Sequence, residues 1–132
     1  MITVGKTATM KTTVNEGATA KAVGSGSLDV FATPMMVALM EHAACEALSD
    51  ALEAGQTSVG TQIDVSHTAA SPLGSVITAT ATVTDVGGRK VEFAVTASDG
   101  AGEIGSGTHA RFIVDETKFM AKMAKMAKVN ER

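Results

Sequence analysis

A change of hydrophobic period near Gly55 constrains this chain more than any other feature. Before it, residues 35–52 form a long apolar stretch whose charged interruptions recur at helical spacing, which indicates an amphipathic helix. Thr33 and Pro34 predict the helix start, as an N-cap and a first helical residue, and Gly55 predicts its stop. Four segments rich in Val, Thr and Ile follow and predict strands at about 58–67, 75–86, 89–98 and 103–114.

Turn signals indicate how these strands connect. A Gly-Gly pair at 87–88 and the run 98–102 are typical of tight turns, so consecutive strands should pair antiparallel. One long helix and such a sheet can bury both elements only if the sheet wraps the helix, which predicts an α+β, two-layer fold for residues 1–132 as a single domain. The open sheet edge of a monomer also predicts dimerisation through the sheet.

The C-terminal residues 116–132 are predicted to form a helical tail. Residues 118–128 repeat Met, Ala and Lys with a period of three, and these are good helix formers. A Met stripe of this kind usually docks on the protein body while Lys faces solvent. The alternative is a basic amphipathic surface for ligand phosphates or a membrane.

Composition excludes several classes of function. The formal net charge of −3 and the pI near 5.5 argue against nucleic acid as a partner. Cys45 is the only cysteine, so no internal disulfide can form, and a reducing cytoplasm is expected. We expect neither a secretory signal in residues 1–14 nor a membrane span, because no apolar run is long enough. The three histidines show no metal-binding spacing, so no metal is expected.

Glu41 is out of place on the predicted helix. A helical wheel of residues 34–54 puts it inside the apolar arc, between Leu48 and Leu52, whereas most other charged side chains lie opposite. A carboxylate there faces the sheet, and the fold must supply hydrogen-bond donors or raise its pKa. Both outcomes suit catalysis. The alternative is a Glu at the edge of the arc that reaches solvent.

His67 ends the first predicted strand, on its apolar face. A single His there can be an ordinary core residue, but Glu41 on the facing helix favours a functional pair. Thr33 and Glu41 are eight residues apart, about 12 Å along a helix, so an imidazole could lie between them. A second subunit could equally contribute one of the groups. Capping alone would explain Thr33.

The last predicted strand carries His109 and Arg111 on one face, alternating with two glycines. They could meet a phosphate of a ligand or line a solvated face, and the pattern does not decide between these interpretations. His42 lies on the polar face of the helix and is expected at the surface, whereas Cys45 is expected in the core.

Three short motifs occur in order, namely Phe31-Ala32-Thr33, Leu39-Met40-Glu41 and His67-Thr68-Ala69-Ala70. With Gly60-Thr61 and the segment 103–111, they resemble the fluoroacetyl-coenzyme A thioesterase family of hot-dog proteins over residues 28–120. The resemblance implies a hot-dog fold, a long central helix wrapped by an antiparallel β-sheet, in a homodimer or a dimer of dimers. It also implies a cytoplasmic acyl-coenzyme A thioesterase that needs no cofactor, since coenzyme A is part of its substrate.

The resemblance implies a catalytic set of Thr33, Glu41 and His67. His67 and Glu41 would activate either Thr33 or a water, and a backbone N–H near Gly60 would hold the developing oxyanion. The candidate substrate-binding residues are Phe31, Gly60, His109 and Arg111.

The segment 23–28, Val-Gly-Ser-Gly-Ser-Leu, departs from the fluoroacetyl-specific form of this fold, which has an aromatic-bearing lid before the first motif. We therefore expect a broader range of short-acyl or aryl-acyl substrates. Two other functions stay open at this point. One is a hot-dog enoyl-coenzyme A hydratase or dehydratase that uses the same His and acid, and the other is a non-catalytic acyl-coenzyme A-binding module in which Glu41 is structural.

Overall fold

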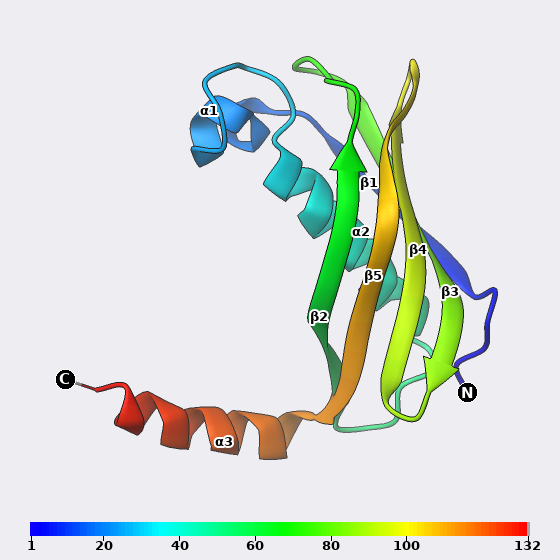
Figure 1. Cartoon of the computed structure of the whole chain (residues 1–132), viewed down its shortest axis with the longest axis vertical. Helices are drawn as coiled ribbons and strands as arrows, with labels where there is room; N and C mark the ends of the chain where they lie inside the picture. Colours follow the sequence, from blue (N-terminus) through cyan, green and yellow to red (C-terminus); the bar gives the residue numbers. More distant parts are fainter. Residues whose placement is uncertain (132) are drawn as a thin grey trace.

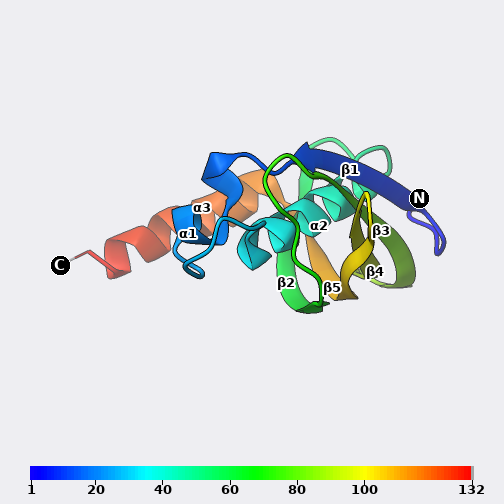
Figure 2. The same ribbon diagram turned by 90° about the horizontal axis from the view of Figure 1, so that it is seen from above.

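The computed structural model describes residues 1–131 and shows a five-stranded antiparallel sheet with one long helix against it (Figure 1). Viewed from above, the sheet curves around that helix (Figure 2). The elements in chain order are β1 (Thr7–Thr13), η1 (Glu16–Ala18), α1 (Ala20–Val23), α2 (Thr33–Leu48), β2 (Gln56–His67), β3 (Val76–Gly87), β4 (Lys90–Asp99), β5 (Gly102–Asp115) and α3 (Glu116–Val129). The predicted hot-dog architecture is confirmed.

The four predicted strands are confirmed as β2 to β5, but their pairing differs in one place. The strand order is β1-β3-β4-β5-β2, so β2 pairs with β5 at the far edge and not with β3. The reason is the connection between β2 and β3, which spans positions 68–75 and is too long for a tight hairpin. Beside β3 lies β1, a strand that was not among those predicted from the sequence.

The start and the end of α2 also differ from prediction. Its N-cap is Ala32, so Thr33 is the first helical residue and its side chain makes no capping hydrogen bond. The helix ends at Leu48, and Gly55 instead forms the turn into β2, where its φ of 83° favours glycine. The hydroxyl of Thr33 is therefore left for another partner.

The core lies between α2 and the inner face of the sheet, and α2 packs mainly against β1 and β3. Alternate residues of β3 and β4 are buried, as expected for strands with one covered face. Small side chains dominate the contact on both elements. The alanines concerned are Ala43, Ala44 and Ala47 on α2, and Ala79, Ala81 and Ala97 on the sheet. They let the helix approach the sheet closely in a chain with few aromatic residues.

A terminal helix is present as α3 within the predicted range 116–132, of which residue 132 lies outside the described residues. It leaves the end of β5 and projects away from the body beyond β2 (Figure 1). Asp115 caps it by accepting a hydrogen bond of 2.9 Å from the Lys118 backbone N–H. The expected docking of its Met stripe is wrong for the single chain, because no residue of α3 is buried and Met120 is 58% exposed. Among residues 1–131, no helix combines the length and apolarity needed to cross a bilayer.

Candidate active site

The first polar cluster joins the start of α2 to the end of β2. Thr33 Oγ1 lies 2.8 Å from His67 Nδ1, within hydrogen-bonding distance. The pair forms because the cap of α2 falls on Ala32, so the Thr33 hydroxyl does not bond the helix backbone. The alternative that Thr33 is only an N-cap is therefore wrong. A hydroxyl beside an imidazole is the pairing that nucleophilic or general-base catalysis needs.

The Thr33–His67 pair borders a cavity of about 250 Å³, also lined by Ser25, Val30 and Phe31. Phe31 is 2% exposed, and its ring meets the His67 ring edge-on with centroids 6.4 Å apart. The second ring nitrogen of His67, Nε2, is buried and has no hydrogen-bond partner among residues 1–131. A buried polar atom without a partner costs about 1–3 kcal/mol, and such atoms often mark functional sites.

Glu41 lies two turns further along α2 and points at β2, as predicted. Its Oε2 is only 2.6 Å from where a Cβ would stand on Gly60, so the glycine leaves room for the carboxylate. The side chain is 38% exposed, which makes it half-buried. Glycine at position 60 thus has a steric reason that the sequence alone did not reveal.

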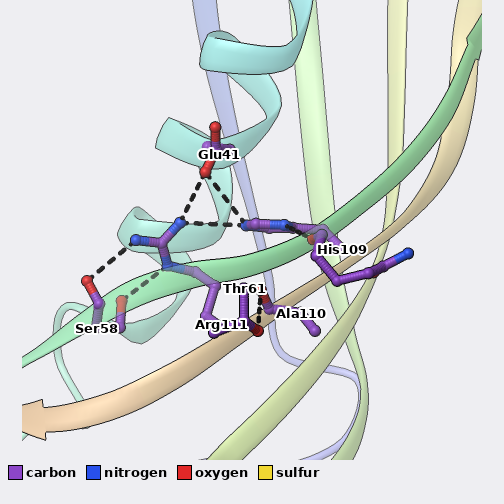
Figure 3. Close-up of polar contacts among 7 residues, drawn as sticks. Glu41, Ser58, Thr61, His109, Ala110 and Arg111 are labelled. Atoms are coloured by element: carbon purple, nitrogen blue, oxygen red, sulfur yellow. Dashed lines mark hydrogen bonds and ion pairs between the residues drawn. The ribbon is translucent and has the colours of Figure 1, made fainter.

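Arg111 holds the Glu41 carboxylate in the second polar cluster (Figure 3). Its Nη1 donates to Glu41 Oε2 at 3.3 Å and to His109 Nε2 at 3.2 Å. Its Nε and Nη2 donate to the side-chain and backbone oxygens of Ser58, at 2.8 and 3.1 Å. Four of the five guanidinium donors are thereby occupied inside the protein.

His109 is the most enclosed member of this second cluster, with 1% exposure, while Arg111 has 6%. Its Nδ1 lies 2.7 Å from the Gln62 carbonyl oxygen, and its ring stacks on Phe93 with centroids 5.9 Å apart. Burial lowers the pKa of His109, and the charge of Arg111 lowers it further, against the opposing effects of the Gln62 carbonyl and Glu41. The interpretation of a solvated face for His109 and Arg111 is wrong.

The three predicted catalytic residues fall into two separate groups within one chain. His67 pairs with Thr33, whereas the imidazole beside Glu41 is that of His109, 4.0 Å from Oε2. The prediction that one imidazole, that of His67, lies between Thr33 and Glu41 is therefore wrong for the single chain. His42 is exposed, as predicted, and Cys45 is half-buried, not fully in the core.

Sequence reasoning missed Ser58 and Gln62, which fix Arg111 and His109 through the contacts described above. Both lie on β2, and they reach the cluster because β2 pairs with β5, where Gly60 stands opposite Arg111. Ser58 contributes its hydroxyl and its backbone oxygen, and Gln62 contributes its backbone carbonyl, so only the strand order brings these groups to their partners. Within residues 1–131, no cluster of His, Cys, Asp or Glu could hold a metal ion.

A sheet wrapped around one long helix, with a hydroxyl–imidazole pair beside a cavity, places the protein among the hot-dog thioesterases. Residues 14–117 match the family described as fluoroacetyl-CoA-specific thioesterase, and the chain belongs to this family.

Two kinds of relative support this placement. The fluoroacetyl-CoA thioesterase of Streptantibioticus cattleyicolor is 50% identical over 95 residues, which cover 72% of this chain and 68% of that protein. A solved structure of a fluoroacetyl-CoA thioesterase superposes with a TM-score of 0.89 at 40% identity, covering 95% of this chain and 97% of the other. A thioesterase superfamily member from Thermus thermophilus gives a TM-score of 0.90 at 26% identity, covering 97% and 95%.

Proposed function

We propose that this protein hydrolyses short or small acyl-coenzyme A thioesters to the free acid and coenzyme A. The observation that carries the proposal is the 2.8 Å contact between the Thr33 hydroxyl and the His67 ring beside a cavity, in a chain of this thioesterase family. The relatives are named for fluoroacetyl-CoA.

The geometry supports Thr33 as the nucleophile. His67 would take the hydroxyl proton while Oγ1 attacks the thioester carbonyl carbon, and the C–S bond would then break to release coenzyme A as the thiol. Water would hydrolyse the acyl group from Thr33 in a second step. The β2 bulge between Gly60 and Gln62 interrupts the ladder with β5, and a backbone N–H there is our candidate donor to the oxyanion. It lies seven residues from His67 on the same strand, about 23 Å, so the donor would come from a second copy of the chain.

The size of the cavity beside this pair supports a small acyl group. The cavity of about 250 Å³ lies below the range of about 300–1,000 Å³ typical of sites for drug-sized ligands. The connection from α1 to α2 carries small residues at 24–27 and no aromatic side chain before Phe31. Both features support short or small acyl groups without a strict requirement for fluorine.

We propose that Glu41 joins the reaction from a second copy of the chain. β2 is an edge strand, and its residues 60–64 form one exposed stretch. The β2 strands of two copies could pair antiparallel about a two-fold axis that passes between positions 62 and 64. Position 67 of one copy would then lie opposite one of the positions 57–61 of the other copy. The His67 end of one strand would then meet the part of the other beside which Glu41 lies. The edge pairing supports a homodimer or a dimer of dimers.

The same proposal covers the setting of the enzyme. The hydrolysis needs only side-chain acid–base groups and water, so we propose no cofactor beyond the coenzyme A of the substrate. The single Cys45 and the acidic net charge support a cytoplasmic protein without nucleic-acid or membrane partners.

The test is to incubate the purified protein with acetyl-, fluoroacetyl-, propionyl-, benzoyl-, crotonyl- and palmitoyl-coenzyme A and to follow free thiol. We expect turnover with the short and small acyl groups and little with palmitoyl. Hydration of crotonyl-coenzyme A without thiol release would replace the proposal with a hydratase. Tight binding of all the esters with no chemical change would leave a binding module.

A further inference from the structure

We infer that His109 is a positioning residue: as a neutral ring with its hydrogen on Nδ1, it accepts a hydrogen bond from Arg111 and aims that guanidinium at Glu41. The inference rests on the proposed hydrolysis only in that Glu41 is assigned there to the reaction. It gives His109 a role different from contact with a ligand.

The partners of the His109 ring determine where its proton lies. The Gln62 carbonyl oxygen, 2.7 Å from Nδ1, can only accept, so Nδ1 must carry a hydrogen. The Arg111 Nη1, 3.2 Å from Nε2, can only donate, so Nε2 must present its lone pair. Only the neutral tautomer with hydrogen on Nδ1 satisfies both contacts. A protonated ring would set an N–H against an N–H of the guanidinium.

The ring has little freedom to leave this arrangement. It is 1% exposed and stacks on Phe93 of the neighbouring strand at an interplanar angle of 27°. The Gln62 contact also ties β5 to β2 beside the bulge, where the ladder between the two strands is irregular. His109 therefore offers Arg111 an acceptor at a fixed position.

A fixed acceptor matters because the guanidinium is planar. Ser58 binds Nε and Nη2 and sets one side of the group, while His109 takes one of the two Nη1 hydrogens. The remaining Nη1 hydrogen then points at Glu41 Oε2, 3.3 Å away. His109 itself lies 4.0 Å from that oxygen, beyond hydrogen-bonding distance, so it acts on the carboxylate through Arg111.

The ring of His109 must also be neutral to hold Arg111 in this position. A cationic imidazole would repel the Arg111 charge and attract the Glu41 oxygen away from Nη1. Burial and the neighbouring guanidinium lower the pKa of His109, which agrees with the neutral form that the hydrogen bonds require. The charged groups that face the ring are Arg111 and Glu41, and both are already members of the cluster.

Two substitutions of similar size separate the two hydrogen bonds of His109. In His109→Asn the side-chain amide lies near the place of Nδ1, so it can still bind the Gln62 carbonyl but cannot reach Arg111. In His109→Gln the amide oxygen reaches the place of Nε2, so it can accept from Arg111 while the contact with Gln62 is lost. The kcat and KM of both variants would be measured with the best substrate of the panel, beside thermal unfolding.

We expect His109→Gln to keep at least about a third of the wild-type kcat and His109→Asn to lose about tenfold or more, with KM changed less than about threefold in both. In an Arg111→Lys background the difference between the two variants should shrink to within about twofold, because lysine lacks the planar group. Equal kcat in the Asn and Gln variants, or losses that follow their melting temperatures, would overturn the inference.

Nitrogen-15 NMR of histidine-labelled protein tests the tautomer without any activity measurement. The resonances of His109, assigned by their loss in His109→Gln, should report a protonated Nδ1 and an unprotonated Nε2 at pH 7. A proton on Nε2, or a doubly protonated ring, would overturn the inference. Failure of the proposed function would appear separately, as a wild-type protein that releases no thiol from any ester.

Discussion

The two polar clusters of this molecule share a helix and a strand but differ in how completely their hydrogen-bonding groups are satisfied. The Thr33–His67 pair lies at the end of β2, where Thr33 is exposed beside a cavity and the buried Nε2 of His67 has no partner. The second cluster lies midway along β2, where Arg111 uses four donors and both nitrogens of His109 are engaged. The first arrangement is suited to reacting and the second to holding a carboxylate in place.

The separation of the clusters follows from helix geometry. Thr33 and Glu41 are the first and ninth residues of α2, so about 12 Å of helix axis divides them. No rotamer of either side chain closes such a distance. The two groups therefore cannot touch within one chain, and the proposed site takes Glu41 from a second copy of the chain, a proposal that makes the comparison testable.

The largest effect is expected from removing the reactive pair. Thr33→Ala and His67→Ala should each lower thiol release by about a hundredfold or more, because each removes a group that forms or breaks bonds in the proposed reaction. His42→Ala is the matched control, since it removes an exposed imidazole of α2 and should change the rate by less than about twofold. Steady-state kinetics with the best ester would measure all three, and wild-type activity in His67→Ala would refute the assignment.

A heterodimer experiment tests whether the clusters cooperate across two chains. Homodimers of Thr33→Ala and of Glu41→Gln should both be nearly inactive. A heterodimer of the two variants would be purified by two different tags. If each site takes Thr33 from one chain and Glu41 from the other, one of the two sites keeps both groups, and we expect about half of the wild-type kcat per dimer. Sites contained within one chain would give no recovery. Co-purified wild-type chains with the same tags serve as the control.

Gly60→Ala should disturb the second polar cluster, in which Arg111 holds the Glu41 carboxylate, without unfolding the protein. The added Cβ would stand 2.6 Å from Glu41 Oε2 and 3.3 Å from Arg111 Nη1, and the end of the Glu41 side chain can move away. We expect kcat to fall about tenfold, equivalent to about 1.4 kcal/mol of barrier, with a melting temperature within a few degrees of wild type. Gly87→Ala, whose Cβ would meet nothing within 4 Å, is the control for alanine in a strand. An unchanged kcat in Gly60→Ala would show that the carboxylate position is not critical.

The sequence was sufficient for the parts of the structure that depend on local periodicity. The period of 3.6 identified the helix and the direction of Glu41, and the alternation identified β2 to β5. It could not provide the pairing of β2 with β5, because strand order depends on how the connections cross the sheet. For the same reason, the contact of Arg111 with Ser58 and the proximity of His109 to Glu41 were beyond sequence reasoning.

The smallest expected effect is on the stability of the folded protein at acidic pH, and it comes from His109 of the second cluster. The folded-state pKa of His109 lies below its ordinary value, so the neutral ring stabilises the folded protein above the unfolded-state pKa of about 6.5. That contribution is lost as the pH falls below about 6.5, because the unfolded chain then binds a proton that the folded one resists.

The melting temperature of the wild type should therefore fall more between pH 7 and pH 5 than that of His109→Gln, by a difference on the order of a few degrees. The depressed pKa values of Asp50 and Asp99 affect both proteins equally and cancel in the difference. Parallel plots of melting temperature against pH for wild type and His109→Gln would contradict this prediction. They would mean that the ring at position 109 accepts a proton as easily in the folded protein as in the unfolded chain, despite its burial in the second polar cluster.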